Sequence, residues 1–169
     1  MPLRYVDPTR ASTPTRRAAS RLLRTRPGRF IAEKIAPRVD VWLGRHVGAR
    51  VSLGMFVVPS ATLTTTGART GQRRQAQVVY FHDGRDVIVL ASNYGGDRHP
   101  QWYHNLVADP DCDLGGDRFR AGEVTDPAEY ARLFGVAERY FGGFAEYRAK
   151  TTRVGRTIPV LRLVPAART

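Results

Sequence analysis

Residues 74–91, RQAQVVYFHDGRDVIVLA, contain two runs of β-prone residues separated by the dipeptide Asp83-Gly84. Valine, isoleucine, tyrosine and phenylalanine favour strands, and Asp-Gly suits the tight turn of a two-residue hairpin. The stretch therefore predicts an antiparallel hairpin with strands over 74–81 and 86–91.

Short strands and turns continue on both sides of this hairpin. Strands are predicted over 51–58, 61–66, 112–114, 117–124 and 158–164, and helices over 100–108, 126–140 and 144–150. Asp126, Pro127 and Glu129 form a helix-start pattern of cap, first-turn proline and capping-box acid. Since strands and helices do not alternate one for one, the pattern indicates an α+β fold. Its core is a small barrel-like, mostly antiparallel sheet of six or seven strands with flanking helices.

The chain has 169 residues, of which 42% are hydrophobic, and this is enough for one domain with its own core. Its single cysteine, Cys112, excludes an internal disulfide and any multi-cysteine metal site. No apolar run approaches the roughly 18 residues of a membrane span, and the basic N-terminus lacks the apolar core of a signal peptide. These features predict a cytoplasmic protein, with peripheral contact at the inner face of the membrane as an open alternative.

Most of the net charge of +12 lies near the N-terminus. Residues 1–50 carry 12 Lys and Arg against 3 Asp and Glu. We interpret residues 1–28 as a basic leader, poorly ordered or partly helical. Residues 29–169 then form a single domain that begins with an amphipathic helix. The leader reflects either a compositional preference for arginine or binding to an anionic membrane, and nucleic acid is an unlikely partner.

Several familiar catalytic motifs are absent. There is no GxGxxG, Walker A loop, HExxH or paired CxxC. His99 and His104 are five residues apart and would face different sides of a helix, so no metal site is predicted. An enzyme with this sequence would rely on a bound organic cofactor.

Two segments contain the residue types that such a cofactor needs. Residues 63–74, LTTTGARTGQRR, predict a strand that ends in a Gly-rich turn. Its hydroxyls, backbone N–H groups and guanidinium groups suit anionic oxygens, although a plain exposed hairpin remains the alternative. Residues 91–106, ASNYGGDRHPQWYHNL, predict a Gly-Gly loop that enters a helix N-terminus. The Trp-Tyr pair there suits either a ring-binding wall or the core.

The two segments together resemble the deazaflavin-dependent nitroreductase family, which uses coenzyme F420. The resemblance covers about residues 55–164. The residues that carry it are Thr64-Thr65-Thr66-Gly67, Gly71-Gln72, Arg74, Ala91-Ser92, Gly95-Gly96, His99-Pro100, Trp102-Tyr103, Asn105-Leu106, Tyr147, Thr151 and Ile158-Pro159-Val160.

The resemblance implies a split β-barrel similar to that of FMN-binding reductases. It also implies hydride transfer between reduced F420 and an organic acceptor, either an activated alkene, a quinone or a nitro compound. FMN on the same barrel is the alternative cofactor, and a non-catalytic protein that binds F420 or an anionic surface is the alternative function. A homodimer is compatible with this fold, and the sequence does not determine it.

The family also implies site residues by position. In the family the basic turn holds the phosphate and the polyglutamate tail of the cofactor, which assigns that role to Arg69 and Arg74. The full predicted cofactor site is Thr66, Gly67, Arg69, Thr70, Gly71, Arg74, Ala91, Ser92, His99, Pro100, Trp102 and Tyr103. The predicted catalytic residues are Ser92 and Tyr147, which would supply a proton or stabilise negative charge. Phe141, Phe144 and Tyr147 would contact the acceptor.

The sequence departs from the family pattern at two basic positions. Ala68 stands where a basic residue is usual, and Asn93-Tyr94 stands where a lysine is usual. Arg73 and Arg98 are the nearest candidates to replace the lost charges. In the last helical region, phenylalanines at 141 and 144 replace two tyrosines of the family.

Overall fold

The computed structural model describes residues 3–9 and 59–166. Two compact units make up the chain, one of residues 1–9 and 60–169 and the other of residues 10–59. Nearly all described residues belong to the first unit. The predicted boundary after residue 28, the helical patterns before residue 49 and the predicted strand over 51–58 lie outside the described residues.

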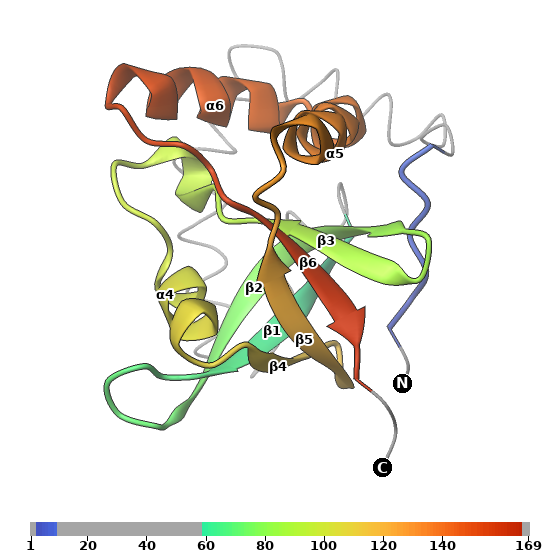
Figure 1. Cartoon of the computed structure of the whole chain (residues 1–169), viewed down its shortest axis with the longest axis vertical. Helices are drawn as coiled ribbons and strands as arrows, with labels where there is room; N and C mark the ends of the chain where they lie inside the picture. The colour runs from blue at the N-terminus through green and yellow to red at the C-terminus, as the bar shows by residue number, and fades with distance from the viewer. Residues whose placement is uncertain (1–2, 10–58, 167–169) are drawn as a thin grey trace, which may run out of the picture. The chain divides into compact units, whose positions relative to one another are not determined.

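Six strands of the first unit form a closed barrel (Figure 1). The elements are β1 Ser60–Thr66, β2 Arg73–Asp83, β3 Asp86–Leu90, the 3₁₀ turn η3 Asn93–Gly95, α4 Gln101–Ala108, β4 Asp111–Leu114, β5 Asp117–Glu123, α5 Pro127–Tyr140, α6 Gly143–Arg153 and β6 Val160–Pro165. The strand order is β1-β2-β3-β6-β5-β4, and every neighbouring pair is antiparallel. The predicted α+β barrel with flanking helices is confirmed.

The β2–β3 hairpin forms as predicted. Asp83 pairs with Asp86, and Gly84 has a positive φ of 65°, which its missing β-carbon allows. Val87 and Val89 of β3 are 0% exposed, as is Ile88, which points to the opposite face of the strand. The strand is therefore buried on both faces, and the core that it joins includes residues of α5 and α6 above the barrel (Figure 1).

The start of α5 is only partly as predicted. The Asp126 carboxylate accepts a hydrogen bond from the backbone N–H of Glu129 at 2.7 Å, and Pro127 occupies the first turn. The Glu129 carboxylate does not close the capping box. It accepts from Arg132 Nε at 2.7 Å and also from Arg162 of β6. A guanidinium is a stronger partner for a carboxylate than a backbone amide, so α5 is tied to the barrel wall instead.

Residues 3–9 pack on β2. The backbone N–H of Val6 donates to His82 Nδ1 at 3.0 Å, and the backbone N–H of His82 donates to Val6 O at 2.8 Å. The hydroxyl of Tyr80 donates to Arg4 O at 2.8 Å, and Val6 is 6% exposed. This part of the predicted leader thus belongs to the barrel unit, while the rest of the leader lies outside the described residues.

Among the described helices, none is long and apolar enough to cross a membrane.

Candidate active site

The turn between β1 and β2 is closed by its own backbone. Gly67 O accepts hydrogen bonds from the N–H groups of Thr70 and Gly71 at 3.1 and 2.8 Å, and Gly67 N donates to Gln72 O at 2.8 Å. A β-carbon on Gly67 would lie 3.0 Å from Gln72 O, and Gly71 has a φ of 66°. The two glycines that mark this turn in the sequence are therefore needed for its shape.

A buried amide from α4 fastens this turn to the rest of the fold. Asn105 is 1% exposed; its Nδ2 donates to Thr65 Oγ1 at 3.0 Å, and its Oδ1 accepts from the N–H of Ala68 at 3.2 Å. The two sequence segments that carry the family resemblance thus meet at one residue. Sequence analysis quoted Asn105 as part of a motif but gave it no role, since both contacts join residues far apart in the chain.

The three arginines of the turn differ in their partners. Arg73 forms an ion pair with Asp113 of β4. Arg74 donates from Nη2 to the Gln72 side chain at 3.0 Å. The Arg69 guanidinium has no hydrogen bond or ion pair within the described part of the chain. Arg69 and Arg74 are thus exposed donors without acidic partners, whereas Arg73 is engaged and is a poor replacement for the charge missing at Ala68.

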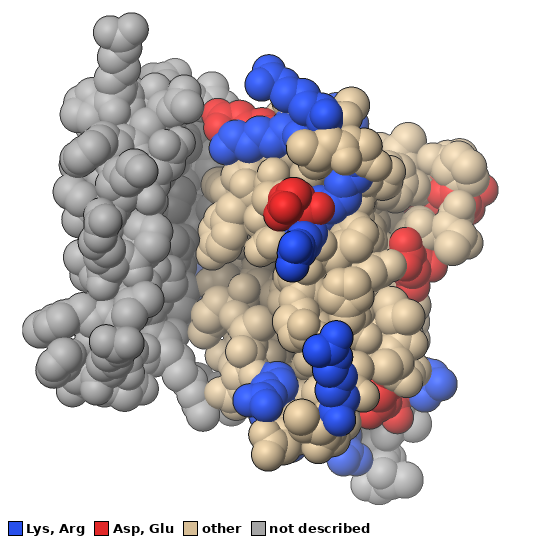
Figure 2. Space-filling model, turned by 90° about the vertical axis from the view of Figure 1, so that its left-hand side faces the viewer, with Lys and Arg blue, Asp and Glu red and all other residues tan. Residues whose placement is uncertain are grey.

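Basic side chains also occur over the wider face that carries the turn and α4. Figure 2 shows Lys and Arg on this face together with several acidic residues and much uncharged surface. The face as a whole therefore has mixed charge.

The loop after β3 turns the chain in the left-handed conformation. Asn93, Tyr94 and Gly95 have φ values of 48°, 54° and 76°. Residues other than glycine adopt this conformation at an energetic cost, and such strain is concentrated at functional sites. A β-carbon on Gly95 would lie 3.0 Å from Tyr147 Cα, so the loop approaches α6 closely. The fold therefore brings Tyr147 beside the turn that begins directly after Ser92.

The three aromatic residues predicted to contact the acceptor form one cluster. The Phe141 ring lies 5.4 Å from that of Phe144 and 6.3 Å from that of Tyr147, and the last two rings are 6.2 Å apart. Phe141 caps the end of α5 instead of lying within α6. Phe144 is 3% exposed and belongs to the core, which leaves Phe141 and Tyr147 half-buried at the surface of the cluster.

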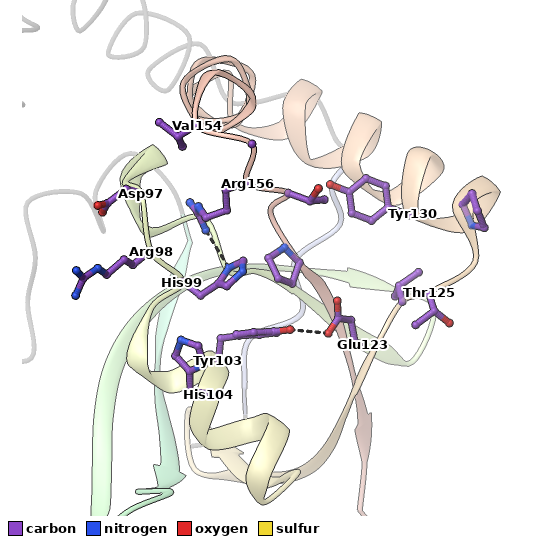
Figure 3. A pocket seen from close by; sticks show the side chains of 15 residues that line it. Asp97, Arg98, His99, Tyr103, His104, Glu123, Thr125, Tyr130, Val154 and Arg156 are labelled. Carbon is purple, nitrogen blue, oxygen red and sulfur yellow. Dashed lines mark hydrogen bonds between the residues drawn. The ribbon is translucent and has the colours of Figure 1, made fainter.

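Sequence analysis missed Arg156, which lies between α6 and β6. It is 8% exposed and donates from Nη1 to Ala91 O at 3.2 Å and from Nη2 to Ser92 O at 2.6 Å. Its Nη1 also lies 3.1 Å from His99 Nδ1 (Figure 3). The only signal in the sequence was its position just before the quoted Ile158-Pro159-Val160.

A pocket of about 810 Å³ opens beside Arg156 (Figure 3). Its walls come from the β3–α4 loop, α4, the end of β5, the start of α5 and the α6–β6 segment. It includes His99 and Tyr103 of the predicted cofactor site, but not Arg69, Arg74 or Ser92. Trp102 packs half-buried against the core, and Pro100 directly precedes α4.

Four side chains that line this pocket have shifted pKa values, namely His99, Tyr103, Tyr130 and Arg156, and the first two bear on ligand binding. Burial, together with the hydrogen bond from its hydroxyl to Glu123 Oε2 at 2.8 Å, raises the pKa of Tyr103 to about 12. Burial and the nearby Arg156 lower the pKa of His99. At neutral pH, Tyr103 is therefore a protonated hydroxyl and His99 a neutral imidazole.

Metal and thiol chemistry find no support among residues 3–9 and 59–166. No group of three or more metal-binding side chains occurs there. Cys112 is buried, and burial raises its pKa to about 12, so it remains a thiol.

Residues 36–165 match the protein family described as F420H(2)-dependent quinone reductase. The chain belongs to this family. An F420H(2)-dependent quinone reductase of Mycobacterium tuberculosis is 33% identical over 147 residues, which cover 74% of this chain and 97% of that protein. A family member is an oxidoreductase with F420 as cofactor, so the predictions of an F420-dependent enzyme and of this cofactor are confirmed.

Solved structures of similar proteins support the fold described above. One described as an F420-H2 dependent reductase is 29% identical, has a TM-score of 0.53, and matches 62% of this chain and 93% of its own. Another, described as a domain-swapped dimer, is 26% identical with a TM-score of 0.54, and matches 75% of this chain and 97% of its own.

The hydrogen-bond donors of the β1–β2 turn suit the acidic tail of the cofactor of this quinone reductase family. The backbone N–H groups of Gly67, Thr70 and Gly71 are used within the turn and that of Ala68 donates to Asn105, so the side chains of the turn and the N–H of Arg69 are left to bind an anion. Arg69 and Arg74 provide charge-assisted donors there without competing carboxylates. The individual assignments of cofactor, acceptor and catalytic residues remain predictions.

We expect Asn105→Ala to lower the free energy of unfolding by about 2 kcal/mol, because it leaves the Thr65 hydroxyl and the Ala68 N–H without their buried partner. Urea denaturation measures this change. Gln101→Ala is the matched control, since Gln101 is exposed on the same helix and reaches Asn105 only at 3.4 Å. Equal stabilities of the two variants would contradict a fastening role for Asn105.

Proposed function

We propose that this enzyme transfers a hydride from F420H2 to a quinone-type acceptor on the face formed by the β1–β2 turn, the β3–α4 loop and α6. The observation that supports this most is the pair Arg69 and Arg74, which have no acidic partner among the described residues and lie on a turn that Asn105 fastens to α4. That arrangement places positive charge beside the helix that follows the loop containing Ser92.

Different segments of the chain bind different parts of the cofactor. Arg69 and Arg74 bind the anionic tail, and the segment from Ala91 to Tyr103 lines the ring. The bound cofactor supplies a hydride. The protein must then hold the acceptor in place, exclude water and provide a proton or hydrogen bond to the acceptor oxygen as negative charge develops.

The aromatic cluster suits a flat, apolar acceptor. Phe141 and Tyr147 present partly buried rings, with Phe144 packed behind them. Rings of this kind contact a quinone through offset or edge-on packing. The Tyr147 hydroxyl is the one polar group of the cluster, and Ser92 precedes the turn that Tyr147 approaches.

Arg69→Ala and Arg74→Ala should each weaken F420 binding about tenfold or more, because each removes a charge-assisted contact of about 1.5–3 kcal/mol. Cofactor fluorescence during titration at moderate salt measures the dissociation constant, and FMN is titrated in parallel as the alternative cofactor. Arg73→Ala is the matched control, since Arg73 is already paired with Asp113. Equal losses in all three variants, or a preference for FMN, would count against the assigned roles of Arg69 and Arg74.

Ser92→Ala and Tyr147→Phe test the proton supply. We expect at least one of them to lower kcat with a benzoquinone acceptor by about 10²-fold, the scale of general acid catalysis, with little change in F420 affinity. Tyr94→Phe is the matched control because it removes a hydroxyl from an exposed ring that lies 6.2 Å from that of Tyr147. Full turnover in both variants would mean that solvent supplies the proton.

We also propose that the basic leader brings the enzyme to anionic membranes, where apolar quinones reside. The support is the charge of residues 1–50, with 12 basic against 3 acidic side chains. Replacement of Arg16, Arg17, Arg21, Arg24 and Arg26 by glutamine, which leaves residues 3–9 intact, should abolish co-sedimentation with phosphatidylglycerol vesicles. Unchanged co-sedimentation, or none by the unaltered protein, would contradict this role.

The relative described as a domain-swapped dimer supports a homodimer as one arrangement open to this chain.

A further inference from the structure

We propose that Arg156 is a positioning residue that holds His99 as a neutral imidazole with its proton on Nε2, so that this N–H is offered to an acceptor atom of a ligand in the pocket. The inference rests on the proposed function in one respect, namely that the loop from Ala91 to His99 lines the cofactor. It concerns Arg156, to which neither the sequence pattern nor the proposed function assigns a role.

The tautomer follows from which atoms donate. Nη1 of Arg156 lies 3.1 Å from His99 Nδ1. A guanidinium has only donors, so Nδ1 must accept. A neutral imidazole has one donor and one acceptor nitrogen, and its proton is therefore on Nε2. Protonation of His99 would replace this hydrogen bond with two adjacent positive charges.

The surroundings of His99 favour the neutral ring. The titratable and charged groups around it are Arg156 from the α6–β6 segment, His104 and Tyr103 from α4, Glu123 from β5, and Asp97 and Arg98 from its own loop. Burial, Arg156 and His104 lower the pKa of His99, Glu123 opposes them, and the net shift is downward.

The Nε2 atom is available to a ligand. No hydrogen bond to it occurs within the described part of the chain, and His99 lines the pocket (Figure 3). The neighbouring Tyr103 ring lies 4.9 Å away, and its hydroxyl proton is held by Glu123. The imidazole N–H of His99 is thus a donor on this wall that an acceptor atom of a ligand can use.

Arg156 couples this imidazole to the loop that contains Ser92. The same guanidinium donates to Ala91 O and Ser92 O, so a shift of one group is transmitted to the other. No described carboxylate lies within ion-pair distance of Arg156, and its buried Nε has no hydrogen-bond partner among the described residues. Asp97 favours the charged form of Arg156 from a longer distance. A buried cation without a close ion-pair partner is costly to desolvate, and the hydrogen bonds to Ala91 O, Ser92 O and His99 offset part of that cost.

Histidine ¹⁵N NMR of the cofactor-free enzyme tests the first half of the proposal, with His99 assigned from His99→Gln. We expect the unaltered protein to show the Nε2–H tautomer, and its His99 to be less protonated than an ordinary histidine at the same pH, because the pKa of His99 is lowered. An Nδ1–H tautomer, or an imidazolium at pH 7, would overturn the proposal without any variant.

Arg156→Met should raise the pKa of His99 and abolish its fixed tautomer, whereas Arg153→Met, which alters an exposed arginine of α6, should leave both unchanged. Arg156→Lys serves as the second variant if Arg156→Met does not fold. In Arg156→Lys the pKa of His99 should stay lowered, but by less than in the unaltered protein. An unchanged His99 spectrum in the folded variant would overturn the role of Arg156.

F420 titration of the same variants tests the second half. We expect Arg156→Met to weaken F420 binding about tenfold at pH 7, and Arg153→Met to have no effect. If Arg156→Met changes the tautomer of His99 but leaves the F420 affinity unchanged, the claim that the ligand accepts a hydrogen bond from His99 is overturned. Failure of the unaltered enzyme to bind F420 would contradict the proposed function, while the NMR result would still decide the role of Arg156.

Discussion

The pairing of β1 with β4 closes the barrel, with Leu63 opposite Leu114 and Thr65 opposite Cys112. Since α4 directly precedes β4, this pairing also decides where α4 lies. The helix is held next to the end of β1, and Asn105 can therefore reach Thr65 and the following turn. Closure thus removes the sheet edges and at the same time joins the basic turn to α4, the helix that follows the loop after β3. The candidate active site depends on that one long-range pairing.

Local signals predicted the strands and turns of this fold well. The Asp83-Gly84 dipeptide predicted the β2–β3 hairpin because the backbone requirement of a tight turn is met within two residues. Asp126 predicted the start of α5 for the same reason. The second half of that capping box was wrong, because Glu129 has an alternative partner in Arg162, which lies in β6 and is invisible to a local pattern.

The site was predictable to the extent that its residues are neighbours in sequence. Asn105 and Arg156 act over separations of 37 to 65 residues, and nothing near either residue indicates its partners. The same limit affects Arg73. Its sequence position made it a candidate to replace the charge missing at Ala68, but β2 and β4 both pair with β1, and across that strand Arg73 forms an ion pair with Asp113. Arg98 lines the pocket and has no ion-pair partner among the described residues, but no residue of the β1–β2 turn lines that pocket, so the replacement by Arg98 stays a prediction.

The protonation states in the pocket limit where the proton for the acceptor comes from. An efficient general acid has a pKa near the working pH. Tyr103 is far from that range, because its pKa is about 12 and Glu123 holds its proton. His99, with a lowered pKa and Nδ1 occupied by Arg156, is neutral at neutral pH, and the N–H that it keeps on Nε2 is too weak an acid to protonate a product. Both side chains are therefore suited to hold a ligand rather than to protonate a product. We accordingly propose that the proton comes from Ser92, from Tyr147 or from water.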